Sequence, residues 1–136
     1  MGMKVGLDTN IFLNVKNKEK AFYKYSKAIL KAVEKGKITS IVSIITIAEL
    51  STGYHQEKEI KEKNEFFAGL YSNNHYNIVE LDFNLADKSG ELRSQINLKL
   101  PDCIIIASCM QEGATCLITN DGDFDGAEKL KIFDFL

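Results

Sequence analysis

Two patterns of apolar and polar residues divide this chain into segments. Short apolar and β-branched runs, bounded by glycine or polar turn residues, predict buried strands. Apolar residues that recur every three or four positions, with polar residues between them, predict amphipathic helices. The strand pattern occupies 4–7, 38–47, 76–81, 116–119 and 131–136, and within 38–47 the spacing becomes helical at Ile44. The helical pattern occupies 20–35, 44–50, 57–71, 84–98 and 101–112.

The order of these segments predicts an α/β fold. Strands and helices alternate along the chain, and the strand segments are apolar on both sides. Such strands are buried on both faces, so the pattern indicates a parallel sheet covered by helices on each side. A length of 136 residues suits one compact domain, and no repeat or linker interrupts the sequence. We therefore expect a single domain over residues 1–136.

The composition excludes several classes of protein. With 45% hydrophobic and 26% charged residues, the chain is neither disordered nor fibrous. No apolar run approaches the roughly 18 residues of a membrane span, and Asp8 comes too early for a signal-peptide core. We expect a cytoplasmic protein that does not insert into membranes. The three cysteines are odd in number and lack metal-ligand spacing, so we expect small core residues: Cys103, Cys109 and Cys116.

The formal net charge of −2 hides an asymmetry along the chain. Residues 1–40 hold nine lysines and three acids, a net charge of +6, whereas the remaining residues hold eight basic and sixteen acidic side chains, a net charge of −8. A polyanionic ligand would be drawn to the lysine-rich part and multivalent cations to the acidic part. The same lysines would also serve as an ordinary solvated helix face.

Acidic residues follow two of the predicted strands. Asp8 comes directly after 4–7, and Asp121 and Asp123 follow 116–119. Ligands of parallel sheets bind beyond the carboxyl ends of the strands, so these positions are candidates for a site. Carboxylates gathered within a few Å raise each other's pKa unless a cation compensates their charge.

Two further acids stand in apolar surroundings, Glu49 before Leu50 and Asp102 before Cys103. Each has a structural alternative, because Asp102 could serve the first turn of a helix and Glu49 could lie half exposed on its helix. Asp8 could likewise cap a helix. Taken together, hard oxygen ligands without a His or Cys partner suit Mg²⁺ or Mn²⁺ rather than Zn²⁺.

Four segments together resemble the PIN-domain family over nearly the whole chain, from about residue 4 to residue 135. Each is weak alone, and their order matches the family. Within it, the chain length and the Pro-Asp and Thr-Asn-Asp forms are most similar to the VapC-type ribonuclease toxins. The segments are Asp8-Thr9-Asn10 after a strand, Ala48-Glu49-Leu50 in a helix, Leu100-Pro101-Asp102 with Ile106-Ala107 opening a helix, and Thr119-Asn120-Asp121-Gly122-Asp123-Phe124.

The resemblance implies a PIN-like three-layer α/β/α sandwich with a five-stranded parallel sheet in the order 3-2-1-4-5. It also implies an endoribonuclease that requires Mg²⁺ or Mn²⁺, with a cognate antitoxin and a homodimeric state. Its catalytic carboxylates would be Asp8, Glu49, Asp102 and Asp121; its metal ligands Asp8, Asp102, Asp121 and Asp123; and its substrate-positioning residues Thr9, Asn10, Thr119 and Asn120.

One departure from the family pattern concerns the contacts with the RNA backbone. Arg93 is the only arginine, so bidentate guanidinium contacts with phosphate are almost excluded and lysines must replace them. The candidates are Lys16, Lys18, Lys20 and Lys24.

Other interpretations of the same residues remain open. Asp121, Asp123, Asp125 and Gly126 match the first half of a calcium loop, but Ile132 stands where its bidentate glutamate is due. Aspartyl-phosphate phosphatases also begin with an aspartate after the first strand, yet need a second carboxylate where Asn10 stands. Within the PIN-like fold, an RNA-processing nuclease without antitoxin and a catalytically silent metal- or RNA-binding module are the alternatives.

Overall fold

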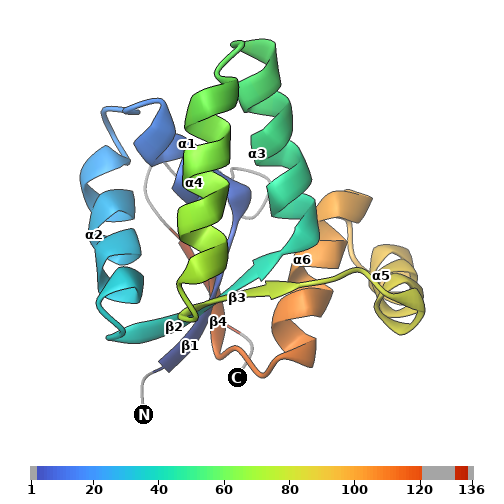
Figure 1. Ribbon diagram of the computed structural model, residues 1–136. Coiled ribbons are helices and arrows are strands. Elements are labelled where there is room, and N and C mark those ends of the chain that lie inside the picture. Colours follow the sequence, from blue (N-terminus) through green and yellow to red (C-terminus); the bar gives the residue numbers. More distant parts are fainter. Residues whose placement is uncertain (1–2, 121–130, 135–136) are drawn as a thin grey trace.

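The computed structural model describes residues 3–120 and 131–134, with side chains as far as residue 120 (Figure 1). The described strands are β1 (Met3–Leu7), β2 (Ile38–Ser43), β3 (Tyr76–Val79), β4 (Cys116–Thr119) and β5 (Lys131–Asp134). The described helices are α1 (Thr9–Lys16), α2 (Tyr23–Glu34), α3 (Ile44–Gln56), α4 (Ile60–Ser72), α5 (Phe83–Gln95) and α6 (Leu100–Gln111).

The five strands form one sheet in the order β3-β2-β1-β4-β5, which confirms the predicted order. Four strands are parallel, since β1 pairs in parallel with β2 and β4, and β2 with β3. The expectation of a wholly parallel sheet is wrong for β5, which runs antiparallel to β4. Only eleven residues separate these two strands, and a parallel return needs a crossover of about a dozen or more.

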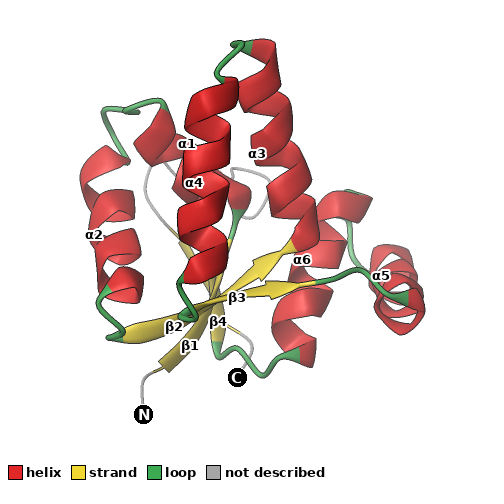
Figure 2. Cartoon of the chain, in the orientation of Figure 1, coloured by secondary structure: helices red, strands yellow, loops and turns green. Residues whose placement is uncertain are grey.

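Helices cover both faces of the sheet and give three layers (Figures 1 and 2). Alternate strand residues point to opposite faces, so β2, β3 and β4 contribute side chains to two cores. On one face Val5 and Val42 pack with side chains of α1 to α4, such as Phe12 and Leu50. On the other face the core is formed with α5 and α6 by residues that include Ile41, Leu117, Leu85 and Ile105.

Helix α6 lies very close to the central strand. A Cβ atom at Gly6 would overlap Cys109 Sγ, so only glycine allows this approach. All three cysteines are buried, as expected of small core residues.

Two of the helices that form the site begin directly after strands: α1 follows β1, and α3 follows β2. The turn or helix start expected at Asp8 is the beginning of α1, eight residues long. The predicted change from strand to helix at Ile44 is confirmed, and Ser43 caps α3 by accepting a hydrogen bond from the Ile45 amide at 3.1 Å. Among the residues that the structure describes, no helix is long and apolar enough to cross a membrane.

Candidate active site

Asp8 stands where β1 ends and α1 begins. Its side chain is buried, with 3% of the residue exposed. Oδ1 accepts a hydrogen bond from the Thr9 amide at 2.8 Å, and Oδ2 accepts one from Thr119 Oγ1 at 2.6 Å. The capping role considered for Asp8 is therefore real, but it uses one carboxylate oxygen while the other faces β4. Donors on both oxygens fix the orientation of the carboxylate.

A chain of hydroxyl groups holds Glu49. Thr9 Oγ1 lies 2.6 Å from Glu49 Oε1 and 3.0 Å from Thr46 Oγ1. Because a hydroxyl has one hydrogen and an ionised carboxylate only accepts, Thr9 donates to Glu49 and is left to accept from Thr46. Thr46 is fully buried one helical turn before Glu49. Thr46 was not identified from the sequence, although a polar residue inside the apolar 44–50 segment was a signal.

Asp102 lies in the first turn of α6, where Pro101 precedes it and Lys99 is the N-cap residue. A carboxylate here complements the helix dipole, as the structural alternative proposed. Its side chain also lines the same cleft as Asp8 and Glu49. The helix-start role and a role in the site are therefore compatible.

A cleft of about 530 Å³ joins these acids. It is bordered by the start of α6 and by facing sides of α1 and α3, and Thr9 and Asn10 line it beside Asp8. Within residues 3–120, no three His, Cys, Asp or Glu side chains come together closely enough to hold a metal ion. The predicted ligands Asp121 and Asp123 lie outside the described residues.

The donor set nevertheless fits a hard divalent cation. Asp8, Glu49 and Asp102 offer only carboxylate oxygens to the cleft. A carboxylate oxygen has two lone pairs, so accepting one hydrogen bond does not by itself prevent it from coordinating an ion. Mg²⁺ and Mn²⁺ suit such ligands, and Zn²⁺ suits them less.

Thr119 is the last residue of β4, and Asn120 follows it. Thr119 is buried and bonded to Asp8, whereas Asn120 Nδ2 donates to Asn14 Oδ1 at 3.4 Å. Asn14 is 3% exposed and also donates to Ser26 Oγ at 2.9 Å. This buried network ties α1 and α2 to the end of β4. Asn14 was missed because its partners lie far away in sequence.

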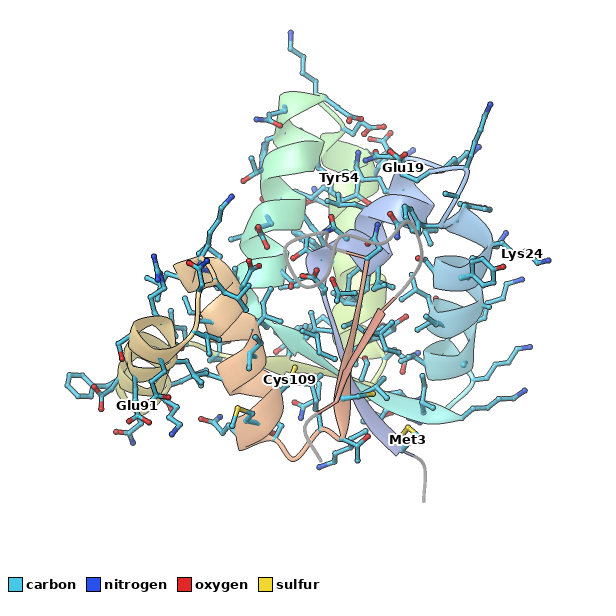
Figure 3. All side chains as sticks on the ribbon, turned by 180° about the vertical axis from the view of Figure 1, so that it is seen from behind. Met3, Glu19, Lys24, Tyr54, Glu91 and Cys109 are labelled. Atoms are coloured by element: carbon cyan, nitrogen blue, oxygen red, sulfur yellow. The ribbon has the colours of Figure 1, made fainter. Side chains whose placement is uncertain are left out.

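The four predicted phosphate-binding lysines fall into two groups. Lys16 is paired with Glu57 and Glu59, both at 3.1 Å, and lies over the ring of Tyr54. Burial lowers the pKa of Lys16, but its hydrogen bonds and charge interactions with the two glutamates outweigh this and raise it. Its ammonium group is therefore occupied. The other three, Lys18, Lys20 and Lys24, are exposed, and Figure 3 shows Lys24 pointing away from α2.

Comparisons with known proteins agree with this architecture. A family model described as PIN domain matches residues 5–130. Among solved structures, a toxin-antitoxin complex from Klebsiella pneumoniae has a chain 24% identical, with a TM-score of 0.68, covering 93% of this chain and 96% of its own. VapBC2 from Rickettsia felis, bound to a promoter DNA fragment, is also 24% identical, with a TM-score of 0.69 and coverages of 95% and 100%.

A third similar structure is more distant in sequence. The sarcin-ricin loop cleaving toxin VapC20 from Mycobacterium tuberculosis is 15% identical, with a TM-score of 0.71 and coverages of 91% and 97%. At these identities the structures support the fold alone. No curated protein matches the chain significantly.

Proposed function

Since the chain belongs to the PIN domain family, we propose that it is a divalent-metal-dependent endoribonuclease that hydrolyses RNA phosphodiester bonds. The observation that carries the proposal is the position of Asp8, Glu49 and Asp102 along one cleft at the carboxyl edge of the sheet. Such an edge is where open parallel sheets bind their ligands. Three carboxylates along one cleft are costly unless a cation compensates their charge.

In this proposal Asp8 and Asp102, together with Asp121 and Asp123, hold Mg²⁺ or Mn²⁺. When bound, the ion would lower the pKa of a water molecule and neutralise charge on the attacked phosphate. Thr119 and the Thr9 amide keep Asp8 aligned. Thr9 aligns Glu49, whose carboxylate can accept a proton, and Asp121 completes the catalytic set. Asn10 and Asn120 flank these groups as substrate-positioning residues.

The exposed lysines Lys18, Lys20 and Lys24 are the proposed contacts for the RNA backbone. They lie in the part of the chain with a net charge of +6, between the end of α1 and the first turn of α2. Lys16 contributes less, because Glu57 and Glu59 already neutralise it.

We further propose a cognate antitoxin and a homodimeric state. Support comes from the similar structures, which include toxin-antitoxin complexes of Klebsiella pneumoniae and Rickettsia felis. A gene for a small DNA-binding protein directly upstream would support the antitoxin. Its absence would favour an RNA-processing nuclease on the same fold.

RNA cleavage with and without Mn²⁺ tests the activity. We expect the purified chain to cut structured RNA internally in millimolar Mn²⁺ and to stop in excess EDTA. Asp102→Asn is the matched control, because it keeps the size of the side chain and removes its charge. Cleavage that persists in EDTA, or that is normal in Asp102→Asn, would show that a contaminant or another site is responsible.

A further inference from the structure

The cleft extends beyond the carboxylates, between two helices that run side by side in the same direction. Thr9 of α1 bonds with Glu49 of α3, and Lys16, the last residue of α1, pairs with Glu57 directly after α3. Cleft-lining residues recur on one face of each helix, at Asn10, Leu13 and Asn17 on the α1 side and at Glu49, Thr52, Gly53 and Gln56 on α3. The cleft therefore follows the helices away from the acids.

Asn17, Gln56 and Gly53 form the far part of this cleft, which we call the amide limb. The amide limb is polar but not cationic. No lysine or arginine is among the described residues that line the cleft. The charge of Glu57 at its outer end is paired with Lys16. Asn17 and Gln56 are both exposed, and neither side-chain amide makes a hydrogen bond within the described part of the chain. Each amide offers donors and an acceptor to an uncharged polar ligand.

Gly53 leaves a gap in the α3 wall of the amide limb. Glycine is less favourable than alanine inside a helix, and at Gly53 it leaves the cleft wall without a side chain. A Cβ atom at Gly53 would meet nothing within 4 Å, and its backbone does not have a positive φ. Neither packing nor conformation requires glycine here. Gly90 of α5 has the same open surroundings and does not line the cleft, so it provides a matched control.

We propose that the amide limb is a subsite for an unpaired nucleobase beside the nucleotide that is cut, an inference that rests on the proposed ribonuclease function. Asn and Gln amides match the donor and acceptor pattern of base edges, which are free in single-stranded RNA. Gly53 lets a flat base approach the helix backbone. A phosphate is disfavoured in the limb, because Lys16 is shared by Glu57 and Glu59, which leaves a net negative charge at the rim, and no cationic side chain among the described residues lines the wall.

The dimensions agree with a neighbouring nucleotide. Gln56 lies seven residues after Glu49, which is about 10 Å along the helix axis. A base at Gln56 is therefore set apart from the carboxylates and reads sequence next to the cut. The cleft volume of about 530 Å³ falls in the range of roughly 300–1,000 Å³ of small-molecule sites.

The first test uses neutral nucleosides and no metal, so it does not depend on catalysis. Adenosine, guanosine, cytidine and uridine are titrated separately to millimolar concentration, and the side-chain amide signals of Asn17 and Gln56 are followed by NMR. We expect saturable shifts with at least one nucleoside, lost for both signals in Gly53→Ala and for the remaining Asn17 signal in Gln56→Leu. Gly90→Ala and Gln95→Leu, which alter helix α5, should behave like wild type.

The second test compares cleavage of an RNA pool with randomised loops. We expect Gly53→Ala to relax base preference at one position beside the cut and to lower kcat/KM roughly tenfold, mainly through KM. Both glycine variants should melt a few degrees higher than wild type, which separates the effect from misfolding.

The outcomes separate the two proposals. Nucleoside shifts without RNA cleavage would support the subsite and overturn the ribonuclease. RNA cleavage with no nucleoside shifts and an unchanged cleavage profile in Gly53→Ala would overturn the subsite, and would leave the amide limb to a protein partner.

Discussion

Thr119 Oγ1 donates a hydrogen bond of 2.6 Å to Asp8 Oδ2, joining two buried residues that lie 111 positions apart in the sequence. The contact exists because β1 and β4 are neighbouring parallel strands whose carboxyl ends coincide. The Thr9 amide holds the other oxygen of the same carboxylate. The chain therefore fixes Asp8 before any ligand binds, which is the preorganisation that an active site requires.

Thr119→Val tests this arrangement. The variant keeps the shape of the side chain but removes the hydroxyl, and hydrogen bonds to charged groups contribute about 2 kcal/mol. We expect the free energy of unfolding, measured with urea, to fall by roughly that amount and cleavage to be strongly reduced. Thr119→Ser restores the donor and should recover both properties. Equal stability of the Val variant and wild type would show that this hydrogen bond contributes nothing.

Metal binding should stabilise the fold. The carboxylates along the cleft repel one another in the absence of a cation, so Mn²⁺ or Mg²⁺ should raise the melting temperature. At a metal concentration about a hundredfold above Kd, the gain is about 2.7 kcal/mol, and less if the metal-free site binds protons. Asp102→Asn should keep or raise stability in EDTA and lose much of the response to metal. A melting curve that millimolar Mn²⁺ leaves unchanged would refute a metal site.

Local patterns in the sequence were sufficient to predict most of the fold. The change at Ile44 from a β-branched run to three- and four-residue spacing placed the end of β2 and the start of α3 correctly. The direction of β5 could not be obtained in this way, because a strand pattern is the same in either direction. Connection length was the physical signal, and the eleven residues before β5 were too few for a crossover helix.

The acidic residues of the site could be predicted from the sequence, whereas the contacts that hold them in place were less predictable. Asp8 and Glu49 were identified from their local surroundings, and the cleft contains both. The hydrogen bond from Thr9 to Glu49 and the ion pair of Lys16 with Glu57 join segments about 40 residues apart, at 2.6 Å and 3.1 Å. Such contacts depend on how α1 packs on α3, which one sequence does not specify.

Lys16 should behave differently from the exposed lysines. Lys16→Met removes two ion pairs and a contact with the Tyr54 ring, so we expect a lower melting temperature. The double variant Lys20→Gln and Lys24→Gln should keep the melting temperature, weaken binding of all RNA sequences and flatten the salt dependence by roughly 0.7 per lost phosphate contact. Unchanged affinity and slope would identify these two lysines as an ordinary solvated surface.

Alkaline pH should destabilise the contact between α6 and the sheet. Burial, together with the charge of Asp8 and the neighbouring Cys116, raises the pKa of the Cys109 thiol from 9.0 to about 12. The unfolded chain therefore loses this proton first, and stability falls as pH rises from about 9 towards 12.

The contribution of Cys109 to the free energy of unfolding is present in full below about pH 9. Above that pH it falls, with a limiting slope of about 1.4 kcal/mol per pH unit. Urea unfolding between about pH 8 and 11 in EDTA should show a shallower slope for Cys109→Ala than for wild type. Burial also raises the pKa of Tyr76, and this residue adds the same pH dependence of stability to both proteins. Parallel curves would contradict the assignment to Cys109.

Asp121 and Asp123, which lie outside the described residues, should contribute unequally to cleavage. Asp121 comes two positions after Thr119, the last residue of β4, and directly after Asn120, which is held to α1. We therefore expect Asp121 to reach a shared cation directly, beside Asp8. Asp123 is separated from it by Gly122, whose backbone freedom allows the chain to turn away, so a water-mediated role is expected.

Single-turnover cleavage over a Mn²⁺ titration distinguishes these two roles. Asp121→Asn should cause the larger loss at saturating metal, because a direct ligand cannot be replaced by raising the metal concentration. Asp123→Asn should reduce activity or metal affinity about 10- to 100-fold, as outer-shell changes do, with partial recovery in excess Mn²⁺. Both substitutions keep the length of the side chain and change the charge and hydrogen-bonding capacity of one group. If Asp123→Asn is the less active variant at saturating Mn²⁺, or if Asp121→Asn cleaves like wild type, the assignment of the two aspartates is reversed.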